Sequence, residues 1–248
     1  MQFYAKSVTG KVRSNNQDCY HIPLGKENEP MLFVVSDGMG GTRGGEVAST
    51  LSTSAFVTFI QSNSEQEDKA LLLRRGAARA NTEVYRAARA DVRFKDMGTT
   101  MTAALVEGES VYILQIGDSR AYLLRDYDLK QITTDHSYVQ ELVEKGYITE
   151  EEAAHHPDKN KITRALGTGS FVNADIYTLP WQPGDLLLLC SDGLSNMLSK
   201  AEIRKIVCLS QGCEKCAEML VEKALEAGGK DNITVVCVRF GDSDGISG

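Results

Sequence analysis

The sequence predicts an α+β fold, a four-layer α-β-β-α sandwich of two mainly antiparallel sheets flanked by helix pairs. Three observations support this fold class. Apolar runs rich in Val, Ile, Leu and Tyr crowd the centre of the chain, short turn sequences separate neighbouring runs, and helical periodicity occurs in two pairs. Because no Pro-rich linker or low-complexity segment divides the sequence, we expect residues 1–248 to form a single domain.

Each predicted strand is a short apolar run bounded by glycine or acidic turn residues, at 31–36, 100–107, 110–117, 121–126, 129–133, 185–191 and 233–240. The sequences "VEGES" and "RDYDLK" between neighbouring runs are typical of hairpin loops and favour antiparallel pairing. Apolar residues at three- and four-residue spacing predict one helix pair at 45–61 and 68–89, and a second pair at 201–209 and 213–227.

The segment 135–169 breaks this pattern, because it is polar and charged and contains two short helical patches. A segment of this length without a clear apolar face is typical of an insertion or lid. A solvated pair of helices explains the composition equally well.

The composition excludes some functions. A net charge of −7 does not favour a nucleic-acid-binding surface, and it suits a site that holds cations or a basic partner. No apolar run approaches the ~20 residues of a membrane helix, and the first ten residues lack the pattern of a secretory leader. We therefore expect a monomeric cytoplasmic protein with free thiols, for which the single Cys213–Cys216 pair is weak evidence of zinc.

Four acidic residues lie at the ends of predicted strands: Asp37, Asp118, Asp192 and Asp231. Asp-Gly is a common hairpin turn, so any one of them is explained by turn geometry alone. The residues after Asp37 and Asp192, however, lead into predicted helices instead of partner strands. Strand ends can meet at one edge of a sheet, so the four carboxylates are expected to converge.

A cluster of carboxylates implies a cation, because like charges at close range raise one another's pKa. Oxygen ligands select hard ions such as Mg²⁺ or Mn²⁺. Arg13, in "RSNNQD", is suited to hold a phosphate bidentately, although a solvated arginine is equally consistent with that residue alone.

Several segments, taken in order, resemble the metal-dependent serine/threonine protein phosphatases of the type 2C (PPM) family, in particular its compact bacterial members. They are "RSNNQD", "VVSDGMGG", "MGTT", "IGDSRAY", "TTDHS", "TRALG", "LLLLCSDGLS" and "GGKDNITVVCV". The resemblance runs from Val8 to Phe240 in the family's order and spacing. It implies that residues 1–248 are one phosphatase catalytic domain and that 135–169 is the substrate-facing flap.

The resemblance also implies a metal centre. Asp37 corresponds to the carboxylate that bridges two Mn²⁺ or Mg²⁺ ions, and Gly38 to the residue whose carbonyl binds the second ion. Asp192 and Asp231 correspond to ligands of the first ion. Asp118 corresponds to the acid that, with Asp192, holds a possible third ion.

Two more residues receive roles from the resemblance. Arg13 corresponds to the phosphate-binding arginine, and Asp18 to an acid beside the metals that orients metal-bound water. The implied reaction is hydrolysis of phosphoserine and phosphothreonine in proteins by direct attack of a hydroxide that bridges the two ions. Phosphorylated proteins, including a bacterial serine/threonine kinase that the enzyme opposes, are the implied partners.

The sequence departs from many family members at two positions. Met39 stands where many eukaryotic members have a histidine that is proposed as general acid, and methionine has no proton to donate. This change and the next one resemble those of bacterial relatives and do not indicate a loss of activity. Gln17 stands where many members have a metal-linked glutamate, so binding of the second ion is expected to depend more on water.

Three alternatives remain open from the sequence. The chain is compatible with a non-catalytic module that binds phosphoproteins, with a hydrolase of another phosphoester such as a nucleotide, and with a phosphatase dedicated to one regulatory partner. Intact Asp37, Asp118, Asp192 and Asp231 argue against the first.

Overall fold

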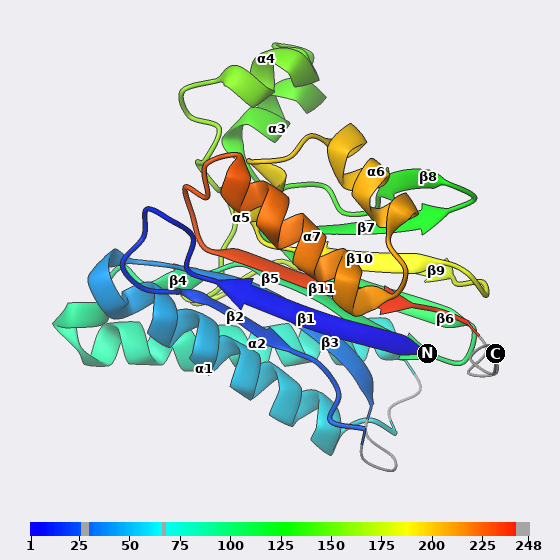
Figure 1. The fold of residues 1–248 in the computed structure, drawn as a ribbon. Helices are drawn as coiled ribbons and strands as arrows, with labels where there is room; N and C mark the ends of the chain where they lie inside the picture. Colours follow the sequence, from blue (N-terminus) through cyan, green and yellow to red (C-terminus); the bar gives the residue numbers. More distant parts are fainter. Residues whose placement is uncertain (26–29, 66–67, 242–248) are drawn as a thin grey trace.

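Two antiparallel sheets stack face to face in the computed structural model, which describes residues 1–25, 30–65 and 68–241 (Figure 1). The first sheet has the order β1 (Gln2–Val8), β11 (Ile233–Arg239), β10 (Leu186–Cys190), β7 (Arg120–Arg125) and β8 (Asp128–Gln131). The second has the order β2 (Asp18–His21), β3 (Met31–Met39), β5 (Met101–Glu107), β6 (Ser110–Ile116) and β9 (Asp175–Pro180), and β4 (Gly98–Thr99) pairs with β3.

Helix pairs cover the two outer faces. The helices α1 (Gly41–Ser62) and α2 (Lys69–Ala90) lie on the sheet that contains β3, and α6 (Lys200–Leu209) and α7 (Cys213–Glu226) lie on the other (Figure 1). A short α5 (Asp192–Ser195) follows β10, and a 3-10 turn, η1 (Val92–Phe94), follows α2. The predicted four-layer α+β sandwich is confirmed.

The polar segment 135–169 contains α3 (Tyr138–Glu144) and α4 (Glu150–His155), which project from the end of the sandwich (Figure 1). Its two ends are paired with each other, because Tyr138 donates to the Lys161 carbonyl and Thr163 donates to the His136 carbonyl. We refer to residues 135–138 and 161–163 as the flap neck.

The core forms three layers because the central strands are apolar on both faces. In β10, Leu186 and Leu188 pack toward α6 and α7, while Leu187 and Leu189 pack between the sheets. This alternation follows from the two-residue period of a strand. A third layer joins the sheet that contains β3 to α1 and α2.

Four strands were not expected from the sequence: β1, β2, β4 and β9. Of these, β4 is only two residues long, and β1, β2 and β9 lie at sheet edges, where a strand has a neighbour on one side only. The residues of these three edge strands are mostly half-buried, so they lack the apolar runs that marked the central strands. The first helix was predicted at 45–61, and only its start was wrong, since α1 begins at Gly41.

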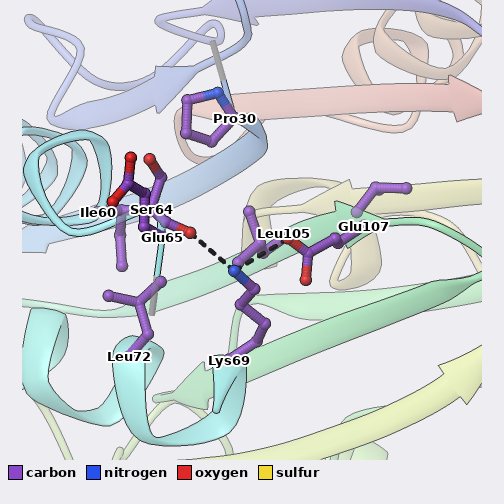
Figure 2. A pocket seen from close by; sticks show the side chains of 9 residues that line it. Pro30, Ile60, Ser64, Glu65, Lys69, Leu72, Leu105 and Glu107 are labelled. Atoms are coloured by element: carbon purple, nitrogen blue, oxygen red, sulfur yellow. Dashed lines mark hydrogen bonds and ion pairs between the residues drawn. The ribbon is translucent and has the colours of Figure 1, made fainter. Parts of the chain in front are cut away.

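A buried lysine joins the beginning of α2 to the sheet. Lys69 is 6% exposed, and its Nζ donates to the Ser64 carbonyl at 2.7 Å and forms an ion pair with Glu107 at 2.9 Å. Figure 2 shows these contacts at the wall of a small pocket lined by Ile60 and Leu72. Because an unpaired charge is costly to bury, these contacts fix where α2 begins on the end of β5.

Within the described residues, no helix has the length and apolar character of a membrane span.

Candidate metal centre

Carboxylates from both sheets line one cavity of about 470 Å³. The second sheet contributes Asp37, the first sheet contributes Asp192 and Asp231, and Asp118 lies in the turn that connects β6 of the second sheet to β7 of the first. Other lining residues include Arg13, Gln17, Gly38, Met39, Thr100, Asn160, Ile162 and Asn232. The convergence predicted from the strand-end pattern is therefore present in the fold.

Asp37 lies inside a strand, and its interpretation as a turn residue was wrong. The strand β3 continues to Met39 because Gly38 and Met39 pair with β4. Thr100 holds the main chain of Asp37 on both sides: its N–H donates to the Asp37 carbonyl at 2.9 Å, and its Oγ1 accepts from the Asp37 N–H at 2.9 Å. The carboxylate is thus carried by a strand whose backbone is fully paired at that point.

Gly38 and Gly45 are in backbone contact between β3 and α1. A Cβ added to Gly38 would lie 2.0 Å from the Gly45 carbonyl oxygen and 2.6 Å from the Gln17 carbonyl oxygen. No side chain fits at that distance. The missing side chain at Gly38 therefore lets α1 begin directly beside the predicted ligand Asp37.

Asp118 occupies the turn between β6 and β7. The side-chain amide of Gln115 donates to the carbonyls of Gly117 at 2.8 Å and of Ser119 at 2.7 Å, on either side of Asp118. The Ser119 hydroxyl lies 2.8 Å from Thr100 Oγ1, the same atom that accepts from Asp37. A continuous chain of hydrogen bonds therefore connects the backbones that carry the two acids.

Asp192 and Asp231 lie at the ends of neighbouring strands in the first sheet. Asp192 is the first residue of α5, and its Oδ2 accepts from Asn196 at 2.9 Å. Asp231 precedes β11, and its Oδ2 accepts from Arg13 at 2.7 Å. Arg13 is half-exposed at the cavity, so the predicted phosphate-binding guanidinium and a predicted metal ligand are in direct contact.

Asp18 lies behind the cavity and is not one of its lining residues. It is the cross-strand neighbour of Asp37, and its Oδ2 accepts from Ser191 at 2.8 Å and Thr234 at 2.6 Å. Its predicted place beside the metal centre agrees with this geometry, while its role in orienting water stays a prediction.

Burial makes these carboxyl groups hard to ionise in the metal-free protein. Desolvation raises the pKa of Asp37 well above its usual value, and the neighbouring charge of Asp18 adds to the effect. Desolvation likewise raises the pKa of Asp18 to about 7 and that of Asp118 to about 8. The pKa of Asp192 is raised by desolvation and by the charge of Asp231.

The donor set fits hard divalent cations. Asp18 Oδ1 and Asp192 Oδ1 are buried and have no hydrogen-bond partner in the described part of the chain. Clustered acids with such orphan oxygens are compensated by a cation. Within residues 1–25, 30–65 and 68–241, no group of three or more His, Cys, Asp and Glu side chains is placed so that it could hold a metal ion by itself. Carbonyl oxygen and water would complete the coordination, as Mg²⁺ and Mn²⁺ sites normally require.

Sequence reasoning missed the role of Asn232. This residue is 4% exposed, and its Nδ2 donates to the carbonyls of Thr9 and Asn15, both at 2.9 Å. Its Oδ1 accepts from the Gln17 N–H at 2.8 Å. It therefore shapes the loop that carries Arg13. The only signal in the sequence is its place directly after Asp231.

Asn160 and Ile162 of the 135–169 segment also line the cavity. Met39 also lines the cavity. The cysteines Cys213 and Cys216 lie elsewhere, buried in the core beneath α7.

Comparison with known proteins agrees with this geometry. Residues 10–227 match the family model described as Protein phosphatase 2C. The chain is 39% identical to the serine/threonine phosphatase stp of Listeria monocytogenes, over 93% of this chain and 92% of that protein. The structure of the serine/threonine phosphatase Stp1 from Staphylococcus aureus superposes with a TM-score of 0.92 at 36% identity, covering 98% of this chain and 96% of Stp1.

A further solved structure is the catalytic domain of the serine/threonine protein phosphatase PstP in complex with two manganese ions. It superposes with a TM-score of 0.87 at 36% identity, over 97% of this chain and 98% of that domain. The acid-lined cavity between two antiparallel sheets thus occurs in a chain that matches the family over most of its length. The chain belongs to the protein phosphatase 2C family.

Proposed function

We propose that this protein is a metal-dependent serine/threonine protein phosphatase that hydrolyses phosphoserine and phosphothreonine in proteins. The observation that carries the proposal is the convergence of four carboxylates from two sheets on one cavity, with Arg13 beside them. The names of the relatives, and the two manganese ions of the PstP complex, support the same reaction class.

Two core ions, Mn²⁺ or Mg²⁺, would be held by Asp37, the Gly38 carbonyl, Asp192 and Asp231. A third, weaker ion would be held by Asp118 with Asp192. When bound, such ions make water a good nucleophile at neutral pH and neutralise the charge of the phosphoryl group.

The protein's own residues bind and orient the substrate. The guanidinium of Arg13 carries several N–H donors in a planar fork, which suits the oxygens of a phosphoryl group. Asp231 accepts one of these N–H groups at 2.7 Å and so orients the fork at the cavity. Met39 has no proton to donate, so the leaving oxygen of serine or threonine takes its proton from another group.

The physiological partners follow from this reaction. The substrates are phosphorylated proteins, and the enzyme opposes a serine/threonine kinase. Asn160 and Ile162 line the cavity, which supports the proposal that the flap contacts a protein substrate. The monomeric state stays a prediction from the sequence.

The decisive measurement is Mn²⁺-dependent release of phosphate from a phosphothreonine peptide, with wild type compared with Asp192→Asn. We expect the variant to be at least ~100-fold slower, because even the loss of an outer-shell partner costs roughly 10–100-fold. Equal rates would exclude Asp192 as a ligand. Binding of the peptide without turnover by wild type would favour the binding-module alternative, and faster hydrolysis of a nucleotide would favour the other phosphoesterase.

A further inference from the structure

The turn that carries Asp118 is attached on both sides to the flap neck. Before Asp118, the main chain of Gly117 forms two hydrogen bonds with His136. The His136 N–H donates to the Gly117 carbonyl at 2.8 Å, and the Gly117 N–H donates to His136 Nδ1 at 3.1 Å. Both polar groups of Gly117 are thereby engaged by the first residues of the flap.

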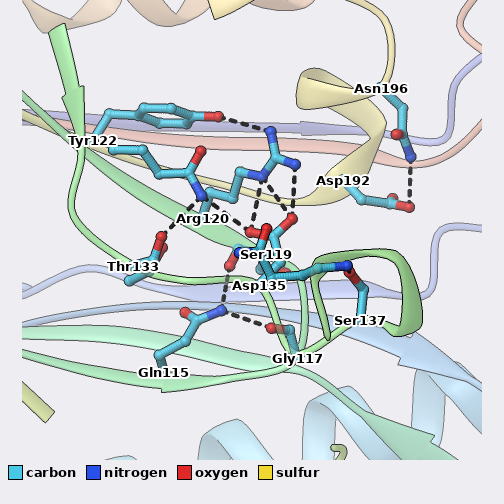
Figure 3. A network of polar contacts seen from close by, with 12 residues as sticks. Gln115, Gly117, Ser119, Arg120, Tyr122, Thr133, Asp135, Ser137, Asp192 and Asn196 are labelled. Carbon is cyan, nitrogen blue, oxygen red and sulfur yellow. Dashed lines mark hydrogen bonds and ion pairs between the residues drawn. The ribbon is translucent and has the colours of Figure 1, made fainter. Parts of the chain in front are cut away.

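After Asp118, Arg120 is held by Asp135. Arg120 Nε lies 3.0 Å from each carboxylate oxygen of Asp135, and its Nη2 donates to Oδ2 at 2.7 Å. The Asp135 side chain is 10% exposed, and its Oδ1 also accepts from Gln131 at 3.1 Å. Figure 3 shows this network, in which Arg120 also donates to the Tyr122 hydroxyl.

We propose that Asp135 is a positioning residue for metal binding at Asp118. Asp135 holds Arg120 in one bidentate geometry, and His136 holds Gly117 by two hydrogen bonds. Together these contacts fix the 117–120 turn and the direction of the Asp118 carboxylate. The inference rests on the proposed function, which assigns Asp118 to the weakest ion. Mg²⁺ demands near-ideal octahedral ligand geometry, and the residues that hydrogen-bond to metal ligands keep those ligands oriented.

A purely structural ion pair is the competing explanation, and the same strand provides a matched control. At the other end of β7, Arg125 Nε and Nη2 donate to the two oxygens of Asp185 at 2.9 and 2.6 Å. The Asp185 side chain is 2% exposed. Five residues of strand, roughly 16 Å, separate Arg125 from Arg120. This second pair therefore has the same bidentate chemistry and a carboxylate that is also largely buried, but it lies away from the acids.

The experiment measures Mn²⁺ binding directly, from the paramagnetic resonance signal of free Mn²⁺ during titration of the intact protein. The Mn²⁺ sites that bind more weakly in Asp118→Asn than in wild type are the class of site to which Asp118 contributes. We expect Asp135→Asn to weaken that same class by about tenfold. Asp185→Asn is expected to leave the isotherm of wild type unchanged, although both variants lower the melting temperature.

Arg120→Lys tests whether geometry or charge matters. Lysine keeps the positive charge but has no planar fork, so positioning predicts the same loss of Mn²⁺ affinity as in Asp135→Asn. Retained affinity in Arg120→Lys, or superposable isotherms of Asp135→Asn and Asp185→Asn, would overturn the inference. A wild-type protein that binds no Mn²⁺ would instead remove the proposed function, and the inference with it.

Discussion

At the scale of single residues, the site depends on a glycine as much as on its acids. Gly38 gives this part of β3 no side chain, and the Gly45 carbonyl of α1 lies in the space that a side chain would occupy. The neighbouring Asp37 keeps its backbone paired with Thr100 while its carboxylate faces the cavity. Close backbone packing thus places the start of a helix against the predicted bridging ligand.

Gly38→Ala is expected to abolish Mn²⁺-dependent phosphatase activity and to destabilise the protein by about 1–3 kcal/mol, as overpacking commonly does. The reason is that the new Cβ would lie 2.0 Å from the Gly45 carbonyl oxygen, so β3 and α1 must separate. Activity and thermal unfolding measure the two effects. Gly169→Ala is the control, since its Cβ would meet only the Phe171 carbonyl oxygen at 3.4 Å. A fully active Gly38→Ala would show that this contact is dispensable.

At the scale of structural elements, the flap is joined to the sandwich by hydrogen bonds at its neck. His136 is central to that junction, being 5% exposed. Its Nδ1 accepts from Gly117, so the ring proton lies on Nε2, which faces Asp175 at 3.0 Å. Arg164, at the other end of the segment, donates to the same Asp175 at 2.9 Å. The neutral ring therefore connects both ends of the flap to the turn before Asp118.

His136 is expected to remain neutral as the pH falls through 6.5, since burial lowers its pKa below that usual value. The charge of Arg164 lowers the pKa further, and Asp175, which raises it, only partly offsets these two effects. Because the unfolded chain takes up the proton first, this group contributes a loss of stability as the pH falls below 6.5. Imidazole chemical shifts measured by NMR between pH 8 and pH 5 report the ionisation. A midpoint at or above ~6.5 would contradict the buried neutral ring.

At the scale of the whole molecule, the cavity acids connect the two sheets. Asp37 comes from the sheet that α1 and α2 cover, Asp192 and Asp231 come from the sheet that α6 and α7 cover, and Asp118 lies in a turn from one sheet to the other. In the metal-free protein these acids repel one another. Bound cations would attract the carboxylates of both sheets and so would hold the two sheets together at this site.

Mn²⁺ is therefore expected to raise the melting temperature of the whole chain, and a chelator to reverse the change. Binding to the folded state alone contributes about 2.7 kcal/mol per site at a metal concentration 100 times Kd. Differential scanning calorimetry with Mn²⁺ and with EDTA measures the shift. Asp192→Asn should lose most of it, and an equal shift in that variant would place the stabilising ion elsewhere.

Local pattern was sufficient for the central strands and for the identity of the acids. The apolar runs at 31–36 and 185–191 reflect burial on both faces, and the ordered motifs around Asp37, Asp192 and Asp231 indicated the family. The edge strands β1, β2 and β9 were missed because one-sided pairing leaves little apolar pattern. The start of α1 was missed because the backbone contact between Gly38 and Gly45 leaves no pattern of capping or apolar residues in the local sequence.

The sequence by itself determined the fold class, the family and the set of chemical groups at the site. Only the tertiary structure decided how those groups are held: Asp37 by Thr100, the Arg13 loop by Asn232, and the Asp118 turn by Asp135 and His136. The physical reason is that apolar periodicity and turn propensity act over a few neighbouring residues. Hydrogen bonds between distant segments depend instead on which strands become neighbours, and that is settled when the two sheets pack.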